Sequence, residues 1–170
     1  MREAAHLPRC LAAEGGQEGT VPDTALEDSI RRLANQAVEV SRERFRVTLD
    51  YSEGSLEMVE GILGELHTGI RRGWLSRLFR RSIPPRQIQY MAGVWGAYVG
   101  EVIRRRWGGE WRRIASKGPG PRVALRVQGT TILPGTKTLN RLMRGPKENL
   151  WEYYQELREE LERKSTRDVR

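Results

Sequence analysis

Few side chains in this sequence have the types and spacing that catalysis or metal binding requires. The only histidines are at positions 6 and 67 and the only cysteine is Cys10, so no cluster has the spacing of metal ligands. Gly93, Gly96 and Gly100 fall inside one helical pattern, unlike the glycine loops that bind phosphates between a strand and a helix. We therefore predict no catalytic residue, no metal and no cofactor, so the protein is not expected to be an enzyme. His67 is expected to have a structural or surface role.

Two polar positions remain as candidates. Glu101 is an isolated acid at the end of an apolar stretch, where pairing with Arg104, Arg105 or a strand arginine is preferred over a role as a buried base or switch. Thr136 and Lys137 begin a short helix, whose free backbone amides could bind an anion. Plain capping is the preferred interpretation there, and an anion-binding site at Thr136 and Lys137 is the alternative.

The charge of the chain is regional. The net charge is +8, but residues 1–70 carry 7 basic and 13 acidic side chains, residues 71–113 carry 11 and 2, and residues 114–170 carry 12 and 7. Nearly all of the basic residues are arginine, which a GC-rich genome also favours. Residues 71–113 are therefore the main candidate for a functional surface, although codon usage could account for part of the signal.

Residues 71–86, RRGWLSRLFRRSIPPR, have the most unusual local composition in the chain. The aromatic and aliphatic residues share one side of a helical wheel and two prolines end the segment, so we predict a short basic amphipathic connector between two core helices. The predicted partner-binding residues lie in this connector and in the arginines that follow it: Arg71, Arg72, Trp74, Arg77, Phe79, Arg80, Arg81, Arg104, Arg105 and Arg112.

Three functions fit this basic band. Tryptophan and arginine are common interface hot spots, and an acidic protein would complement the charge, so a protein-interaction module, adaptor-like or immunity-like, is the first hypothesis. A nucleic-acid-binding accessory protein is the alternative, although no motif of such proteins is apparent. Association with a membrane surface through residues 71–83 is the third. The simplest interpretation, with aromatic residues in the core and arginines in solvent, stays open beside them. The aromatic residues concerned are Trp74, Phe79, Trp107 and Trp111.

The elements that position this band centre on residues 88–107. No formal charge occurs from residue 87 to residue 100, and a helix that is apolar all round must be buried all round, so we predict a central helix. The uncharged run is shorter than the roughly 20 residues that a bilayer crossing needs. The three glycines of this helix cost roughly 1 kcal/mol each relative to alanine, and close packing against another backbone must offset that.

The segments before the central helix have three different patterns. A T-x-x-E capping box at Thr24 and Glu27 predicts a helix from residue 24 to about residue 44. Alternating apolar residues over 45–51 predict an extended strand. Ser52 is a good N-cap for a second helix, whose apolar stripe continues to Ile70.

Three short apolar runs follow the central helix, at residues 111–115, 123–127 and 130–133, and predict an antiparallel meander. A short helix over 136–144 and a last helix from about Pro146 complete the chain. The predicted fold class is α+β, with a small antiparallel sheet of 3–4 strands and about five helices around one buried glycine-containing helix. We expect residues 1–22 to be a disordered tail, 23–164 one domain and 165–170 a frayed tail. The single cysteine and the lack of a signal-peptide core favour the cytoplasm, and the oligomeric state is left open.

The second half of the chain contains the stretches GAYVGEVIRRRWGGEW, VALRVQG and ILPGTKTLNRLMRG. These stretches resemble a family of bacterial domains of unknown function, and residues 49–56 resemble the opening of that family, so that residues 45–158 are covered. The resemblance implies an α+β domain and no activity, and the arginine-rich connector departs from it. The residues that match its motifs are Gly96, Gly100, Glu101, Gly109, Trp111, Pro134, Lys137, Arg141 and Gly145.

Overall fold

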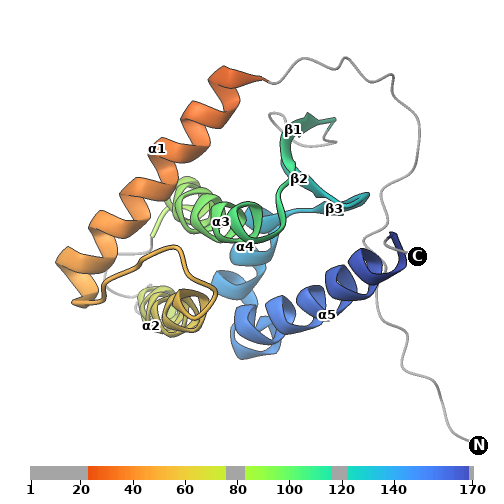
Figure 1. The fold of residues 1–170 in the computed structure, drawn as a ribbon. Helices are drawn as coiled ribbons and strands as arrows, with labels where there is room; N and C mark the ends of the chain where they lie inside the picture. Colours follow the sequence, from red (N-terminus) through yellow and green to blue (C-terminus); the bar gives the residue numbers. More distant parts are fainter. Residues whose placement is uncertain (1–22, 76–82, 116–121, 169–170) are drawn as a thin grey trace, which may run out of the picture.

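A computed structural model of the chain describes residues 23–75, 83–115 and 122–168 (Figure 1). In this part of the chain five α-helices accompany one three-stranded antiparallel sheet, which confirms the predicted fold class. The predicted tail 1–22 lies outside the described residues, and the last helix continues past residue 164. The elements are α1 (Thr24–Val40), the π-helix η1 (Ser41–Phe45), α2 (Ser55–Leu75), α3 (Pro85–Trp107), β1 (Glu110–Ile114), β2 (Arg122–Val127), β3 (Thr130–Ile132), α4 (Pro134–Arg144), the 3-10 helix η3 (Pro146–Glu148) and α5 (Leu150–Asp168).

Helix α3 is the central element, as predicted. Ile88, Ala92 and every residue from Val94 to Ile103 are buried. Its most extensive packing is against α1 and α4, and Figure 1 shows it enclosed by the other elements. Because residues 94–103 of α3 are covered on all sides, their apolar surface and their few polar groups must find partners within the protein.

Two of the three glycines of α3 allow close packing, and the third does not. A Cβ atom at Gly96 would come within 2.5 Å of the Cα atom of Gly135, at the start of α4. A Cβ atom at Gly100 would overlap the indole ring of Trp111 on β1. At Gly93 a Cβ atom would meet nothing within 4 Å, so the packing role predicted for that residue is wrong.

The sheet is the meander that the sequence predicts. Its order is β1-β2-β3, with Trp111 opposite Leu125 and Leu125 opposite Ile132. The β2–β3 hairpin turns at Gln128 and Gly129, both with positive φ (46° and 75°), as a two-residue type I′ turn requires. The three predicted strands are confirmed to within two residues at each end.

The strand predicted over residues 45–51 is wrong. Phe45 ends η1, and residues 46–54 form a loop in which Arg46 and Tyr51 both have left-handed backbone conformations (φ 59° and 63°) that break an extended path. The alternation itself is real, because Leu49 is buried and Phe45, Val47 and Tyr51 pack against the core while the residues between them are exposed. A loop that lies on a core can therefore show the same period of two as a strand.

Several helix ends differ from the predictions. Helix α1 begins at Thr24, but its cap is Asp23, whose carboxylate accepts a hydrogen bond from the Leu26 amide at 2.9 Å. The predicted capping box is therefore wrong. Helix α2 begins at Ser55, so Ser52 lies before the N-cap position, but its hydroxyl accepts a hydrogen bond from the Ser55 amide at 3.2 Å. Helix α4 begins at Pro134 rather than at residue 136, and η3 precedes α5, which begins at Leu150.

Candidate functional site

The three consecutive arginines at the C-terminal end of α3 all have partners within the protein. Arg104 donates from Nε and Nη2 to the two carboxylate oxygens of Glu101, at 2.8 and 3.0 Å. The guanidinium of Arg105 lies 3.5 Å from the ring centroid of Tyr51, and Arg106 donates to Glu53 at 2.8 Å. These contacts join α3 to the loop 46–54, and they leave these guanidinium groups less available to another molecule.

Glu101 is the centre of a buried polar cluster. Its carboxylate is 3% exposed and accepts a third hydrogen bond from Nε1 of Trp111 at 2.8 Å. Burial alone would raise the pKa of Glu101, but the hydrogen bonds from Arg104 and Trp111 outweigh it, so that pKa lies below its usual range. The predicted pairing of Glu101 with Arg104 is thus confirmed, and the carboxylate is a structural anion that ties α3 to β1.

Glu53 connects three elements, which are the loop 46–54, helix α3 and helix α5. One carboxylate oxygen accepts from Arg106 and the other accepts from the hydroxyl of Tyr154 at 2.6 Å. Burial and the neighbouring carboxylate raise the pKa of Tyr154 above its ordinary value. The hydroxyl therefore stays protonated and donating over the physiological range.

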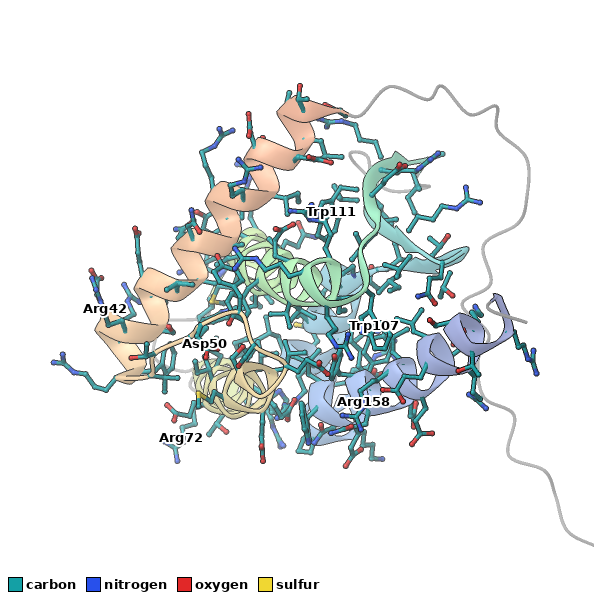
Figure 2. All side chains as sticks on the ribbon, viewed as in Figure 1. Arg42, Asp50, Arg72, Trp107, Trp111 and Arg158 are labelled. Atoms are coloured by element: carbon teal, nitrogen blue, oxygen red, sulfur yellow. The ribbon has the colours of Figure 1, made fainter. Side chains whose placement is uncertain are left out.

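The aromatic residues that follow the arginines of α3 are also engaged within the fold. Trp111 is 5% exposed, and the guanidinium of Arg106 lies 4.5 Å from the ring centroid of Trp107. In Figure 2 both tryptophans lie among the packed elements. Arg112, the last predicted partner-binding residue, donates to Glu110 at 2.9 Å. A partner-binding role for Arg104, Arg105 and Arg112 stays a prediction, and the geometry shows what each guanidinium already contacts.

At the predicted anion site at the start of α4, Lys137 already contacts a carboxylate of the protein itself. Lys137 donates to Glu148 at 3.1 Å and lies 5.0 Å from the ring centroid of Tyr153. Burial acts to raise the pKa of Glu148, but Lys137 and Arg144 outweigh it, so that pKa is lowered. Thr136 is part-exposed in the first turn of α4. The contact of Lys137 with Glu148 favours the structural interpretation, although anion binding by Thr136 and Lys137 itself stays a prediction.

The predicted connector is described only at its two ends, residues 71–75 at the end of α2 and 83–86 at the start of α3. Arg71 and Arg72 are exposed near the end of α2, and Arg86 is exposed at the second residue of α3. Among the described residues none of these three has a hydrogen-bond, ion-pair or aromatic partner. Figure 2 shows Arg72 at the periphery of the molecule. We call Arg71, Arg72 and Arg86 the connector arginines. The side chains of the other five predicted residues lie outside the described residues: Trp74, Arg77, Phe79, Arg80 and Arg81.

A second set of arginines was missed in the sequence. Arg42, Arg44 and Arg46 are exposed in and directly after η1, and they too have no partner among the described residues. We call them the η1 arginines. Arg42 is at the edge of the molecule in Figure 2. The run RERFR was visible in the sequence, but it fell in the acidic first part of the chain and at a predicted helix-to-strand change, which concealed it.

His67 has a structural contact. It is 8% exposed, and its Nδ1 is 2.7 Å from the carbonyl oxygen of Leu142 in α4. A Cβ atom at Gly145 would come within 2.6 Å of its Nε2. Within residues 23–75, 83–115 and 122–168 no group of three or more His, Cys, Asp or Glu side chains could hold a metal ion. In the same part of the chain no helix has the length and apolar content that a membrane crossing requires.

Comparison with known proteins adds no relative. No family model matches the chain, and neither a curated protein nor a solved structure matches it. The resemblance of residues 45–158 to a bacterial domain family therefore gains no support and stays a prediction. Any function has to be argued from the side chains themselves.

Proposed function

We propose that this protein is a non-enzymatic interaction module, adaptor-like or immunity-like, that binds an acidic protein in the cytoplasm. The contact surface would be the connector 71–86 with its flanking arginines. The observation that supports this is the state of the connector arginines, which are exposed and without a partner among the described residues. Arginine forms two parallel hydrogen bonds with a carboxylate, as Arg104 does with Glu101, so carboxylates are its natural ligands.

Nucleic acid is the second candidate ligand, and the fold makes it less favourable than the sequence did. Binding to single strands needs aromatic rings on which bases can stack, beside cations that contact phosphates. Trp111 is buried and the ring of Trp107 is covered by Arg106. The side chains of Trp74 and Phe79 lie outside the described residues, and Tyr90, 53% exposed, is the most exposed aromatic ring of the band among the described residues. Membrane-surface association through residues 71–83 stays the third candidate.

Affinity capture from a lysate of the source organism, with and without nuclease, tests the proposal. The decisive variant changes Arg71, Arg72 and Arg86 to glutamine together. Its matched control changes three exposed arginines of α1, α4 and α5 that each have a partner three or four residues away, so that both variants lose the same charge. The control positions are Arg31, Arg144 and Arg163.

The expected result is a set of acidic proteins that survives nuclease, is retained by the control variant and is lost from the connector variant. An equal loss in both variants would show general charge attraction and contradict the proposal. Recovery that disappears on nuclease treatment, and that weakens by orders of magnitude between about 50 and 200 mM salt, would favour nucleic acid instead. Retention on vesicles of anionic lipid, lost in the connector variant, would favour the membrane surface.

A further inference from the structure

The turn that ends the first helical segment has an unusual backbone. The carbonyl of Ser41 accepts hydrogen bonds from the amides of Arg46 and Val47, the latter at 3.1 Å, which closes η1 as a π-helical turn. Arg46 takes the left-handed conformation at φ 59° that ends the turn. Glycine is the usual residue at such a position, because a side chain there is strained. The sequence has arginine instead, and π-helical turns of this kind are frequent at functional sites.

The side chains on this turn point to a ligand outside the described residues. Arg42, Arg44 and Arg46 are all exposed, and none contacts a carboxylate or an aromatic ring of the described chain. Glu43 is the only acidic residue of the turn, and it is exposed as well. Some exposed arginines elsewhere contact an acid, as Arg31 does with Asp28 at 3.4 Å, whereas Arg122 and Arg167 also have no partner among the described residues.

The turn lies at the same end of α3 as the connector. Two contacts show that helices α1 and α3 run in opposite directions. Asp23 at the start of α1 pairs at 2.8 Å with Arg113 on β1, the strand that directly follows the C-terminal end of α3. Near the other end of α1, Gln36 accepts from the hydroxyl of Tyr90 at 2.7 Å. Arg86 is one helical turn before Tyr90 on α3, on the same face. Figure 1 shows one end of α1 by the sheet and the other far from it.

We infer that the η1 arginines are a second carboxylate-binding element of the interface that the connector begins, an inference that rests on the proposed function. The occupant is an acidic segment of a protein partner, whose carboxylates the three guanidinium groups bind. Charge complementarity supports an acidic occupant, and a protein is preferred to nucleic acid because η1 itself offers no ring for base stacking. Its one aromatic residue, Phe45, packs edge-on against Trp95, with the ring centroids 6.3 Å apart. In this inference the side chain of Arg46 takes part in binding, which accounts for an arginine at a left-handed position where glycine would relax the turn.

The probe for this inference is a fluorescent peptide of glutamate residues at low salt, with binding measured by anisotropy. Changing Arg42 and Arg44 to glutamine leaves the backbone unstrained, and we expect it to weaken peptide binding about tenfold. Arg46→Gly is expected to weaken binding several-fold and to raise the melting temperature, since it relaxes the turn. The variant of Arg31, Arg144 and Arg163 is the control for lost charge.

The outcomes separate this inference from the proposed function. If the connector variant weakens binding and the Arg42, Arg44 variant binds like the wild type, the inference is overturned and the proposed function stands. If the wild type does not bind the peptide, or if the control loses as much affinity as the η1 variants, carboxylate recognition by this turn is overturned. If the protein binds a single-stranded DNA oligonucleotide more tightly than the glutamate peptide of equal charge, and the η1 variants lose that binding, the ligand is nucleic acid and the inference of an acidic protein is overturned. A lower melting temperature for Arg46→Gly would overturn the role assigned to its strain.

Discussion

The two ends of α3 carry arginines in opposite circumstances. At the C-terminal end, Arg104 and Arg106 bind carboxylates and Arg105 lies on a tyrosine ring, so these side chains hold the loop, the helix and the sheet together. At the other end, Arg86, with the η1 arginines and the rest of the connector arginines, has no partner among the described residues. The same residue type builds the fold in one region and leaves its charge exposed in the other. Regional charge in a sequence is thus an upper limit on the charge that a surface presents.

The largest effect is expected from removing the acid of the first region. Glu101→Ala would leave the buried Nε1 of Trp111 without its acceptor and Arg104 without its counter-charge, and we expect a loss of about 3 kcal/mol in the free energy of unfolding. Glu101→Gln keeps the shape and one acceptor, so its loss should be smaller. Urea denaturation followed by tryptophan fluorescence measures both.

Glu110→Ala is the control for that experiment. Its pair with Arg112 is exposed, with 64% of the Glu110 side chain accessible, so the expected loss is below about 1 kcal/mol. Equal losses in the free energy of unfolding at Glu101 and Glu110 would contradict the view that burial makes the Glu101 pair important for stability.

The next largest effect on stability is expected at the glycines of α3, where Gly100 is packed tightly and Gly93 is not. Gly100→Ala would force the new methyl group into the ring of Trp111, and overpacking of this kind costs about 1–3 kcal/mol. Gly93→Ala meets nothing within 4 Å, so we expect it to stabilise the helix by up to about 1 kcal/mol. Thermal denaturation of the two variants should shift in opposite directions, and a shared sign would refute this account of the glycines.

Those two glycines illustrate what the sequence could predict. Their spacing and the lack of charge around them predicted a buried helix with close packing, because burial follows from composition alone. Which glycine touches another element depends on where α4 and Trp111 come to lie, and nothing in a helical pattern contains that information. The meander was predictable for the same reason as the helix, since glycine and proline mark its turns locally.

The candidate site was less predictable, and the arginines show why. The connector was found by its composition, but the partners of Arg104 and Arg106 come from positions 3 and 53 residues away. Pairing with Glu101 was predicted because it is local. Pairing with Glu53 was not, because it depends on the tertiary fold. The η1 arginines were hidden by a period of two that indicated a strand where the chain forms a turn and a loop.

A smaller effect is expected from acid. The pKa of Glu101 is lower in the folded protein than its ordinary value, so the folded state binds fewer protons there than the unfolded state does. Its contribution to stability is full above the unfolded value of about 4.3 and is lost as the pH falls through the folded pKa. Melting temperatures measured between neutral and acidic pH should fall less steeply for Glu101→Gln than for the wild type. Parallel curves would show that other carboxyl groups carry the acid sensitivity.

The smallest effect on stability is expected at the connector arginines. Changing Arg71, Arg72 and Arg86 to glutamine removes no contact with the described residues, so the free energy of unfolding should change by less than about 0.5 kcal/mol. Arg104→Gln loses a bidentate ion pair and should cost about 1–3 kcal/mol in the same urea titration. A cost for the connector variant as large as that of Arg104→Gln would place its arginines with those that build the fold. If the connector variant is as stable as the wild type and no longer captures the partner, these arginines serve recognition and not folding.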